Sequence, residues 1–155
     1  MGIRSGPAWR RKPRIEKNTG ASGYCEEFSK LRQIKVRLIA RALPGAIRPG
    51  VALCVYRVVE EALGNVAKHS GAKRVVVSIS GRGDALHAAI RDDGHGFDLD
   101  QVKGKGLGLI SMEERVRHLG GTFSIAPKPG EGTRIEIRIP LETIPPAVAA
   151  ESTTS

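Results

Sequence analysis

The segment from residue 51 to about residue 69 constrains the fold more than any other, because it carries a long apolar helical pattern. Its apolar residues recur at steps of 3, 1, 3, 1 and 3, a spacing that gathers side chains into one continuous stripe on a helix. A helix with one such stripe buries it against another layer of the fold. Gly71 is predicted to end this helix in the left-handed conformation. The residues of the stripe are Val55, Val58, Val59, Ala62, Leu63 and Val66.

Shorter patterns on either side of this helix predict further helices and two β-hairpins. Alternating apolar and polar residues indicate strands, and turn-forming segments at 81–84 and 127–132 join two pairs of them. No strand-helix-strand alternation demands a doubly wound parallel sheet, so we expect an α/β (α+β) two-layer sandwich with helices on one face of a mixed sheet. The predicted helices are residues 26–33, 51–69 and 106–119, and the predicted strands are residues 34–39, 73–80, 86–91, 122–126 and 133–139.

The net charge of +9 is concentrated near the N-terminus, where residues 1–20 hold six basic residues against Glu16. This stretch has no apolar periodicity. We therefore expect a disordered basic leader at 1–22, one folded domain at 23–142 and a disordered tail at 143–155. A basic segment attracts nucleic acid or acidic membranes. However, aromatic residues make up only 4% of the chain, so stacking platforms are scarce and a nucleic-acid-binding module is disfavoured.

Cysteine usage and hydropathy indicate a cytoplasmic protein. Cys25 and Cys54 are too few for a disulfide framework and are expected to be reduced thiols. The sequence has no apolar run long enough to cross a membrane. Its basic N-terminus lacks the apolar segment of a secretory signal.

The polar edge of the long helix carries the first candidate site. Glu61 and Asn65 are one turn apart and project side by side, and Lys68 and His69 lie one turn further on. Magnesium prefers hard oxygen ligands and usually takes several of them from phosphates. An Asn oxygen can supply one ligand, a carboxylate can orient a water, and a Lys can contact phosphate as a point charge.

The second candidate is the sequence Asp92-Asp93-Gly94-His95-Gly96, directly after a predicted strand. A carboxylate at this position can accept a hydrogen bond from the exocyclic amine of adenine. Glycines on both sides of His95 let the backbone turn close beneath a flat base. Strand alternation aims only one of Asp92 and Asp93 inward, and the pattern alone leaves both open.

The third candidate is the glycine-rich stretch Gly104-Lys105-Gly106-Leu107-Gly108, which opens the second amphipathic helix. Glycines at the start of a helix can expose backbone N–H groups to phosphate, and the helix dipole adds to the attraction. The spacing is not that of the dinucleotide fingerprint, and no Walker-type phosphate loop is present.

Taken in order, these three stretches resemble the ATP-binding domain of the GHKL superfamily. Residues 61–65 match its N box, residues 92–96 its G1 box and residues 104–108 its G2 box, and Thr133 matches the threonine that helps to hold the adenine-binding Asp. Residues 55–70 (VYRVVEEALGNVAKHS) and the MEERV run at 112–116 are similar to bacterial two-component sensor histidine kinases, especially those that pair with NarL-type response regulators.

The resemblance implies a Bergerat-type ATP-binding fold with a mostly antiparallel sheet, and Mg-ATP as its ligand. It implies Asn65 as the Mg²⁺ ligand and Glu61 and Lys68 as catalytic side chains. It favours Asp92 for adenine, with Thr133 beside it. The γ-phosphate would pass to a histidine on a separate dimerisation domain, and a NarL-type regulator would act downstream. Residues implied to bind the cofactor are Asn65, Asp92, Gly94, Gly96, Gly104, Gly106, Leu107, Gly108 and Thr133.

This chain departs from whole sensor kinases in two respects. None of its histidines, at positions 69, 87, 95 and 118, has the helix and acidic neighbour expected of the phosphoacceptor. The ATP lid, residues 97–103, is short. The sequence therefore predicts a catalytic module that acts on a separate acceptor. This prediction is compatible with a longer parent kinase that is anchored in a membrane. The alternative is a stand-alone GHKL regulatory protein that resembles anti-sigma-factor serine kinases.

Overall fold

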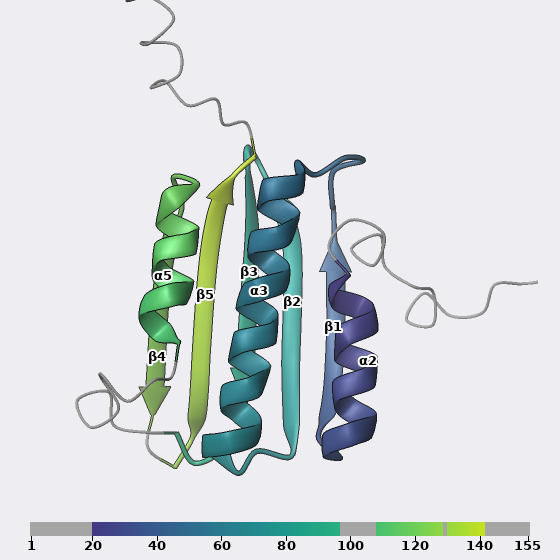
Figure 1. The fold of residues 1–155 in the computed structure, drawn as a ribbon, viewed down its shortest axis with the longest axis vertical. Helices are drawn as coiled ribbons and strands as arrows, with labels where there is room; N and C mark the ends of the chain where they lie inside the picture. The colour runs from purple at the N-terminus through teal and green to yellow at the C-terminus, as the bar shows by residue number, and fades with distance from the viewer. Residues whose placement is uncertain (1–19, 97–107, 129, 142–155) are drawn as a thin grey trace, which may run out of the picture.

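A computed structural model describes residues 20–96, 108–128 and 130–141, which form a five-stranded sheet with helices on one face (Figure 1). The helices are α2 (Ala21–Arg32), α3 (Pro49–Asn65), the single π-helical turn η2 (Val66–Ser70) and α5 (Leu109–His118). The strands are β1 (Lys35–Arg41), β2 (Arg74–Arg82), β3 (Ala85–Asp92), β4 (Thr122–Lys128) and β5 (Gly132–Pro140).

The sheet has the strand order β1-β2-β3-β5-β4. The pairs β2–β3 and β4–β5 are the two predicted hairpins, and β3 also pairs with β5 in the antiparallel sense. Only β1 and β2 are parallel among the described strands, because helix α3 carries the chain from the end of β1 back to the start of β2. The predicted two-layer sandwich with a mixed, mostly antiparallel sheet is therefore confirmed.

The core lies between the sheet and the helix layer. The apolar stripe of α3 is almost completely buried, as its periodicity predicted. It faces alternate residues of the central strands, such as Val77 and Ile79 of β2. The flanking helices complete the layer: α2 packs against β1 and α3, and α5 packs against β4 and α3 (Figure 1). No helix among the described residues is long and apolar enough to span a bilayer.

Several element boundaries differ from the predicted ones. Helix α2 begins at Ala21 and not at residue 26, so two residues of the predicted leader belong to the folded domain. Ala21 and Cys25 are buried in the core, and this tertiary burial stabilises helix that the Ser-Gly sequence at 22–23 alone would not favour. Helix α3 begins at Pro49, two residues before its predicted start at residue 51, because Pro fits the first helical turn, where its missing N–H is not needed.

Other predicted segments lie outside the described residues. They are residues 1–19 of the leader, the predicted lid 97–103, and the tail 143–155. The glycine-rich stretch is described only from Gly108, and α5 begins at Leu109 where the sequence predicted residue 106.

Candidate functional site

The C-terminal end of α3 carries the first group of predicted site residues. Glu61 and Asn65 lie on the last turns of this helix, and the chain then continues as the π-helical turn η2. The Ser70 hydroxyl donates to the Val66 carbonyl at 3.0 Å and accepts the Ala72 N–H at 3.0 Å, which secures the turn. Gly71 follows at φ 67°, so its predicted left-handed conformation is confirmed. A π-turn offsets the side chains that follow from an α-helical register, and Lys68 and His69 are exposed on it.

The end of β3 carries Asp92, which points into the covered side of the sheet and is buried. Its Oδ1 accepts the Gly94 N–H at 2.8 Å, and the Thr133 N–H also donates to this carboxylate. Burial nevertheless raises the pKa of Asp92, because the charged form loses hydration and the two hydrogen bonds only partly offset that loss. A buried carboxylate with accepting capacity beyond these bonds is suited to a donor on a ligand.

Asp93 points the opposite way and has a different task. Its Oδ1 accepts the backbone N–H groups of Lys73 at 2.9 Å and Arg74 at 3.0 Å, where β2 begins. These hydrogen bonds, with that from Arg74 strongest, lower the pKa of Asp93. Strand alternation therefore separates the two neighbouring carboxylates: Asp93 holds the start of β2, and Asp92 faces the helix layer.

A small cavity joins the end of α3 to the ends of β3 and β5. Its volume of about 20 Å³ suits one water molecule and is too small for a nucleotide base. The Thr133 hydroxyl is the one buried side-chain polar atom without a hydrogen-bond partner in the described part of the chain. The lining residues are Ala62, Asn65, Val66, Ser70, Ile90, Asp92, Leu109, Ile125, Thr133 and Ile135.

Two glycines allow the backbone to close around this cavity. At Gly94 a Cβ would overlap the carbonyl oxygen of Ser70, and at Gly132, where φ is 97°, a Cβ would overlap the carbonyl oxygen of Asp92. The loop after β3 is tied to η2 by the His95 N–H, which donates to the Ser70 carbonyl at 2.9 Å. Gly94 and Gly96 are both buried. Side-chain-free positions thus let three chain segments meet at the cavity.

The start of α5 meets the edge of α3 at Glu61. Gly108 is the residue before α5, at φ 72°, and a Cβ there would overlap the Glu61 carboxylate. A negative charge at a helix N-terminus is favourable, since the first N–H groups and the helix dipole attract it. The predicted residues Gly104, Gly106 and Leu107 lie outside the described residues.

Sequence patterns alone did not single out some residues that build the site. Ser70 fixes the π-turn, and Ile125 and Ile135 form the apolar wall of the cavity. Their proximity depends on the strand order, which places β5 between β3 and β4. Among these residues only Ser70 had a local sequence signal, because the Ser-Gly pair at 70–71 is typical of the end of a helix. The structure does bring Asn65, Asp92 and Thr133 to one cavity and sets Glu61 against Gly108.

Comparison with known proteins gives one family match and several relatives. Residues 50–143 match the family described as histidine kinase-, DNA gyrase B- and HSP90-like ATPases. The sensor histidine kinase LiaS of Bacillus subtilis is 36% identical over 122 residues, which are 79% of this chain and 33% of that protein. This chain therefore spans about a third of the length of its curated relatives.

Solved structures share the fold. A histidine kinase domain from the blue-light-activated kinase EL346 of Erythrobacter litoralis has a TM-score of 0.63 at 24% identity, covering 80% of this chain and 61% of that one. The ATP-binding domain of PrrB from Mycobacterium tuberculosis has a TM-score of 0.56 at 26% identity, covering 77% of this chain and 89% of that domain. The family match, residues 50–143, includes the segments that form the cavity.

Proposed function

The chain belongs to the family of histidine kinase-, DNA gyrase B- and HSP90-like ATPases, and on that premise we propose that it is the ATP-binding catalytic domain of a sensor histidine kinase. It would bind Mg-ATP and donate the γ-phosphoryl group to a histidine on a dimerisation and acceptor domain. The kinase names of its relatives support this proposal. The motif order along the chain supports it independently.

One observation carries the proposal: a buried carboxylate, an amide side chain and an unpartnered buried hydroxyl line the same cavity. The buried Asp92 can accept a hydrogen bond from the adenine amine. Thr133 can hold a water against Asp92, and the cavity volume suits that arrangement. The residues present therefore fit the adenine end of a purine nucleotide.

The phosphate end of the nucleotide would lie toward α3 and α5. Asn65 can supply an uncharged oxygen to Mg²⁺, which accepts few protein ligands when phosphates provide the others. Lys68 is exposed and can pair with phosphate. Bound Mg-ATP supplies the transferable phosphoryl group. Glu61 would orient the metal-bound waters or the acceptor, and Gly104, Gly106, Leu107 and Gly108 would follow the phosphates.

The acceptor would be a histidine outside this chain. Of the four histidines, His87 lies on β3, His118 ends α5, His69 lies in η2, and His95 lies in the loop after β3. None follows the helical pattern that the family uses for its acceptor. We propose that the domain acts in the cytoplasm with an acceptor domain of the same or another chain, and that a NarL-type response regulator receives the phosphoryl group.

Calorimetry with Mg-ATP tests the binding half of the proposal. Asp92→Asn should weaken binding about 10- to 150-fold, because a charge-assisted hydrogen bond contributes about 1.5–3 kcal/mol and the amide would turn a donor toward the adenine amine. Asp93→Asn is the matched control: its Oδ1 can still accept the N–H groups of Lys73 and Arg74, so affinity should stay unchanged. Equal losses in the two variants would contradict the assignment of Asp92.

The metal half of the binding site is tested with Asn65→Ala. This variant should lose the dependence of ATP affinity on Mg²⁺ while its thermal unfolding midpoint stays close to that of the wild type, because Asn65 is only half-buried. Glu60→Ala provides a control on the same helix, since Glu60 pairs with Arg57 at 2.9 Å and does not line the cavity. A Mg²⁺ dependence that survives in Asn65→Ala would reject the ligand assignment.

Labelled ATP and a separately produced acceptor domain test the phosphotransfer. Label on the acceptor that is lost in acid and kept in alkali would be phosphohistidine, as proposed. Acid-stable phosphoserine on a partner would instead favour the regulatory-kinase alternative. Tight ATP binding with no transfer to any acceptor would leave a nucleotide-dependent binding domain and reject the kinase assignment.

A further inference from the structure

The open face of the sheet, on the side away from the helices, carries a concentration of basic side chains. Strand alternation sends every second residue to this face, and the strand register aligns them in rows. In one row Arg37 lies beside Val76, Val76 beside Arg91, and Arg91 beside Arg134. We name this surface the basic face. Its basic residues are Lys35, Arg37, Arg41, Arg74, Arg82, Arg91, Lys128, Arg134 and Arg138.

The basic face has few compensating charges within the described residues. Glu136 accepts a hydrogen bond from Arg134, and Asp93 lies near Arg74 at the start of β2. Arg138 reaches the turn residue Asp84 at 3.5 Å, with both side chains exposed. Arg91 stands directly opposite Arg134 in the antiparallel register. Like charges directly opposite on neighbouring strands destabilise a sheet, and among the described residues Glu136 forms its ion pair with Arg134 and not with Arg91.

His87 lies on the basic face at β3, the central strand of the sheet. Its neighbour across the register is Arg138. Partial burial lowers the pKa of this imidazole, Arg82 and Arg138 lower it further, and Glu136 opposes them. Two arginines therefore lie near the imidazole on this face, with one carboxylate opposing them.

The centre of the basic face is hollowed. Small residues form its floor, among them Ser78, Ala89 and Ser124, while Arg82, Arg134 and Arg138 stand around it. The hollow has a volume of about 510 Å³. Five strands at the usual spacing span about 19 Å between the outer two, which is wider than a single helix of about 10 Å. Figure 1 shows that α2, α3 and α5 all lie on the other side of the sheet, so no described helix covers this face.

We propose that the basic face docks an acidic segment of a partner protein, whose carboxylates pair with the arginines of this face. The guanidinium group presents a planar fork that matches a carboxylate in two hydrogen bonds, and arginines outnumber lysines here. The small-residue floor gives a protruding helix or strand room to approach. The surface is separate from the nucleotide site, which lies on the covered side of the sheet.

Two other anionic partners fit the basic face less well. Single-stranded nucleic acid binds sheets through stacked aromatic rings, and no Phe, Tyr or Trp faces this side among the described residues: Phe123 packs into the core, and Tyr24, Phe28 and Tyr56 belong to helices. A membrane surface is broad and would bridge over a hollow, leaving its polar floor uncontacted. The concave shape and the arginines both favour a protein segment.

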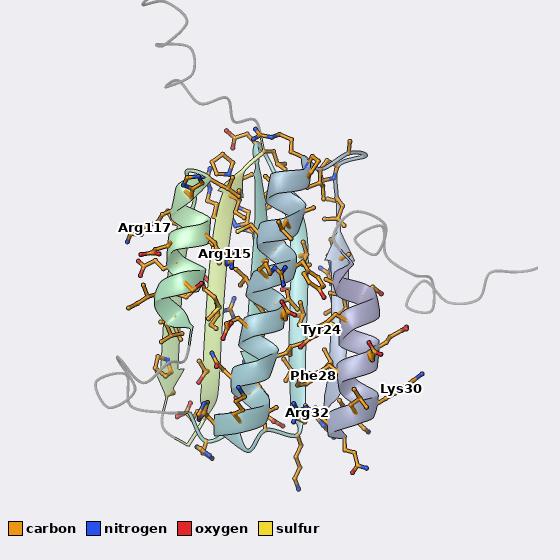
Figure 2. All side chains as sticks on the ribbon, in the orientation of Figure 1. Tyr24, Phe28, Lys30, Arg32, Arg115 and Arg117 are labelled. Atoms are coloured by element: carbon orange, nitrogen blue, oxygen red, sulfur yellow. The ribbon has the colours of Figure 1, made fainter. Side chains whose placement is uncertain are left out.

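Fluorescence titration with a short Glu-rich peptide tests the proposal on the full chain without nucleotide. The double variant Arg91→Gln/Arg134→Gln should bind the peptide about 2- to 30-fold more weakly, since each exposed ion pair contributes about 0.2–1 kcal/mol. The control Arg32→Gln/Arg117→Gln removes the same charge from α2 and α5, where these arginines lie on the helix side of the molecule (Figure 2). This control should bind like the wild type.

Two further measurements separate docking from general charge attraction. Arg91→Lys/Arg134→Lys keeps the charge and removes the planar forks, so its affinity should fall between those of the wild type and the Gln variant. The NMR titration of His87 should move to higher pH when the peptide is bound, because nearby carboxylates stabilise the imidazolium. A His87 titration unchanged by saturating peptide would overturn the proposal.

Parallel titrations with anionic phospholipid vesicles and with duplex DNA complete the test. The proposal is rejected if vesicles or DNA bind and the peptide does not, or if the α2/α5 control loses as much affinity as the Arg91/Arg134 variant. Neither result depends on ATP. Failure here is therefore distinct from failure of the kinase assignment, which the Mg-ATP titrations measure.

Discussion

The two faces of the sheet are built from the same strands and have opposite chemistry. Along β2, Val75, Val77 and Ile79 enter the core, while Val76 and Ser78 turn away from it. The covered face is apolar except at one end, where Asp92 and Thr133 are buried beneath α3. The open face is basic and has no described helix over it (Figure 1).

This difference indicates that the covered face stabilises the fold, whereas the charged open face is available for binding. On the covered face the folding energy comes from apolar contacts. Each buried polar group there costs free energy of folding unless hydrogen bonds offset its loss of hydration. On the open face the charges contribute little to stability and are free to vary with a partner. Substituting a functional residue on the covered face should therefore change the free energy of unfolding. Substituting one on the open face should change only the affinity for a partner.

The largest expected effect comes from truncating one side chain on each face of β2. Ile79→Ala should reduce the free energy of unfolding by about 2–5 kcal/mol, because it leaves a cavity in a packed core at a site only 1% exposed. Val76→Ala, on the open face and 37% exposed, should cost less than about 1 kcal/mol, the span of strand propensities. Urea denaturation measures both, and equal costs would mean that the open face is covered in the folded protein.

The second effect separates backbone strain from crowding beside Asp92. Gly132→Ala places a Cβ against the Asp92 backbone at positive φ, so we expect a loss of about 2–4 kcal/mol from strain and overpacking together. Gly130→Ala is the matched control, because it has φ 82° and open space around it, and should lose only about 1–2 kcal/mol. Thermal unfolding of the two variants measures the difference. Equal losses would show that Asp92 does not approach Gly132 closely.

The third effect is a pH dependence at the one acidic side chain buried on the covered face of the described strands. The folded state binds the Asp92 proton more tightly than the unfolded state does, because burial raises this pKa. The contribution of Asp92 to wild-type stability is therefore greatest at acidic pH and falls as pH rises through the raised pKa. Asp92→Asn cannot ionise, so its unfolding free energy relative to the wild type should improve from acidic to neutral pH. A difference that stays constant over that range would contradict the raised pKa.

The smallest effect concerns the buried thiols. Burial raises the pKa of Cys25 to about 12 and that of Cys54 to about 11, so almost no thiolate is present near neutral pH. We expect no measurable alkylation by iodoacetamide in the folded protein and rapid alkylation in urea, followed by mass spectrometry. Rapid reaction of either thiol under native conditions would mean that the helix layer opens locally.

Much of the molecule could be predicted from the sequence, because local patterns report local structure. Every residue of the predicted apolar stripe is buried in the structure. The stripe could be predicted because a helical period depends only on sequence spacing, such as that of Val55, Val58 and Leu63. The two hairpins followed from alternation and turn residues. The resemblance to the GHKL superfamily is confirmed by the family match, whereas the narrower resemblance to kinases with NarL-type partners stays a prediction.

The tertiary structure decided what depends on residues far apart in the chain. Sequence spacing left Asp92 and Asp93 equivalent, but packing placed Asp92 with Asn65 and Thr133 at one cavity and set Asp93 to hold the start of β2. Likewise, the arginines of the basic face are scattered among five strands in the sequence, and only the strand register aligns them. A periodic pattern fixes which way each side chain points on its own element, whereas neighbours across a sheet are fixed by the order and register in which the strands pair.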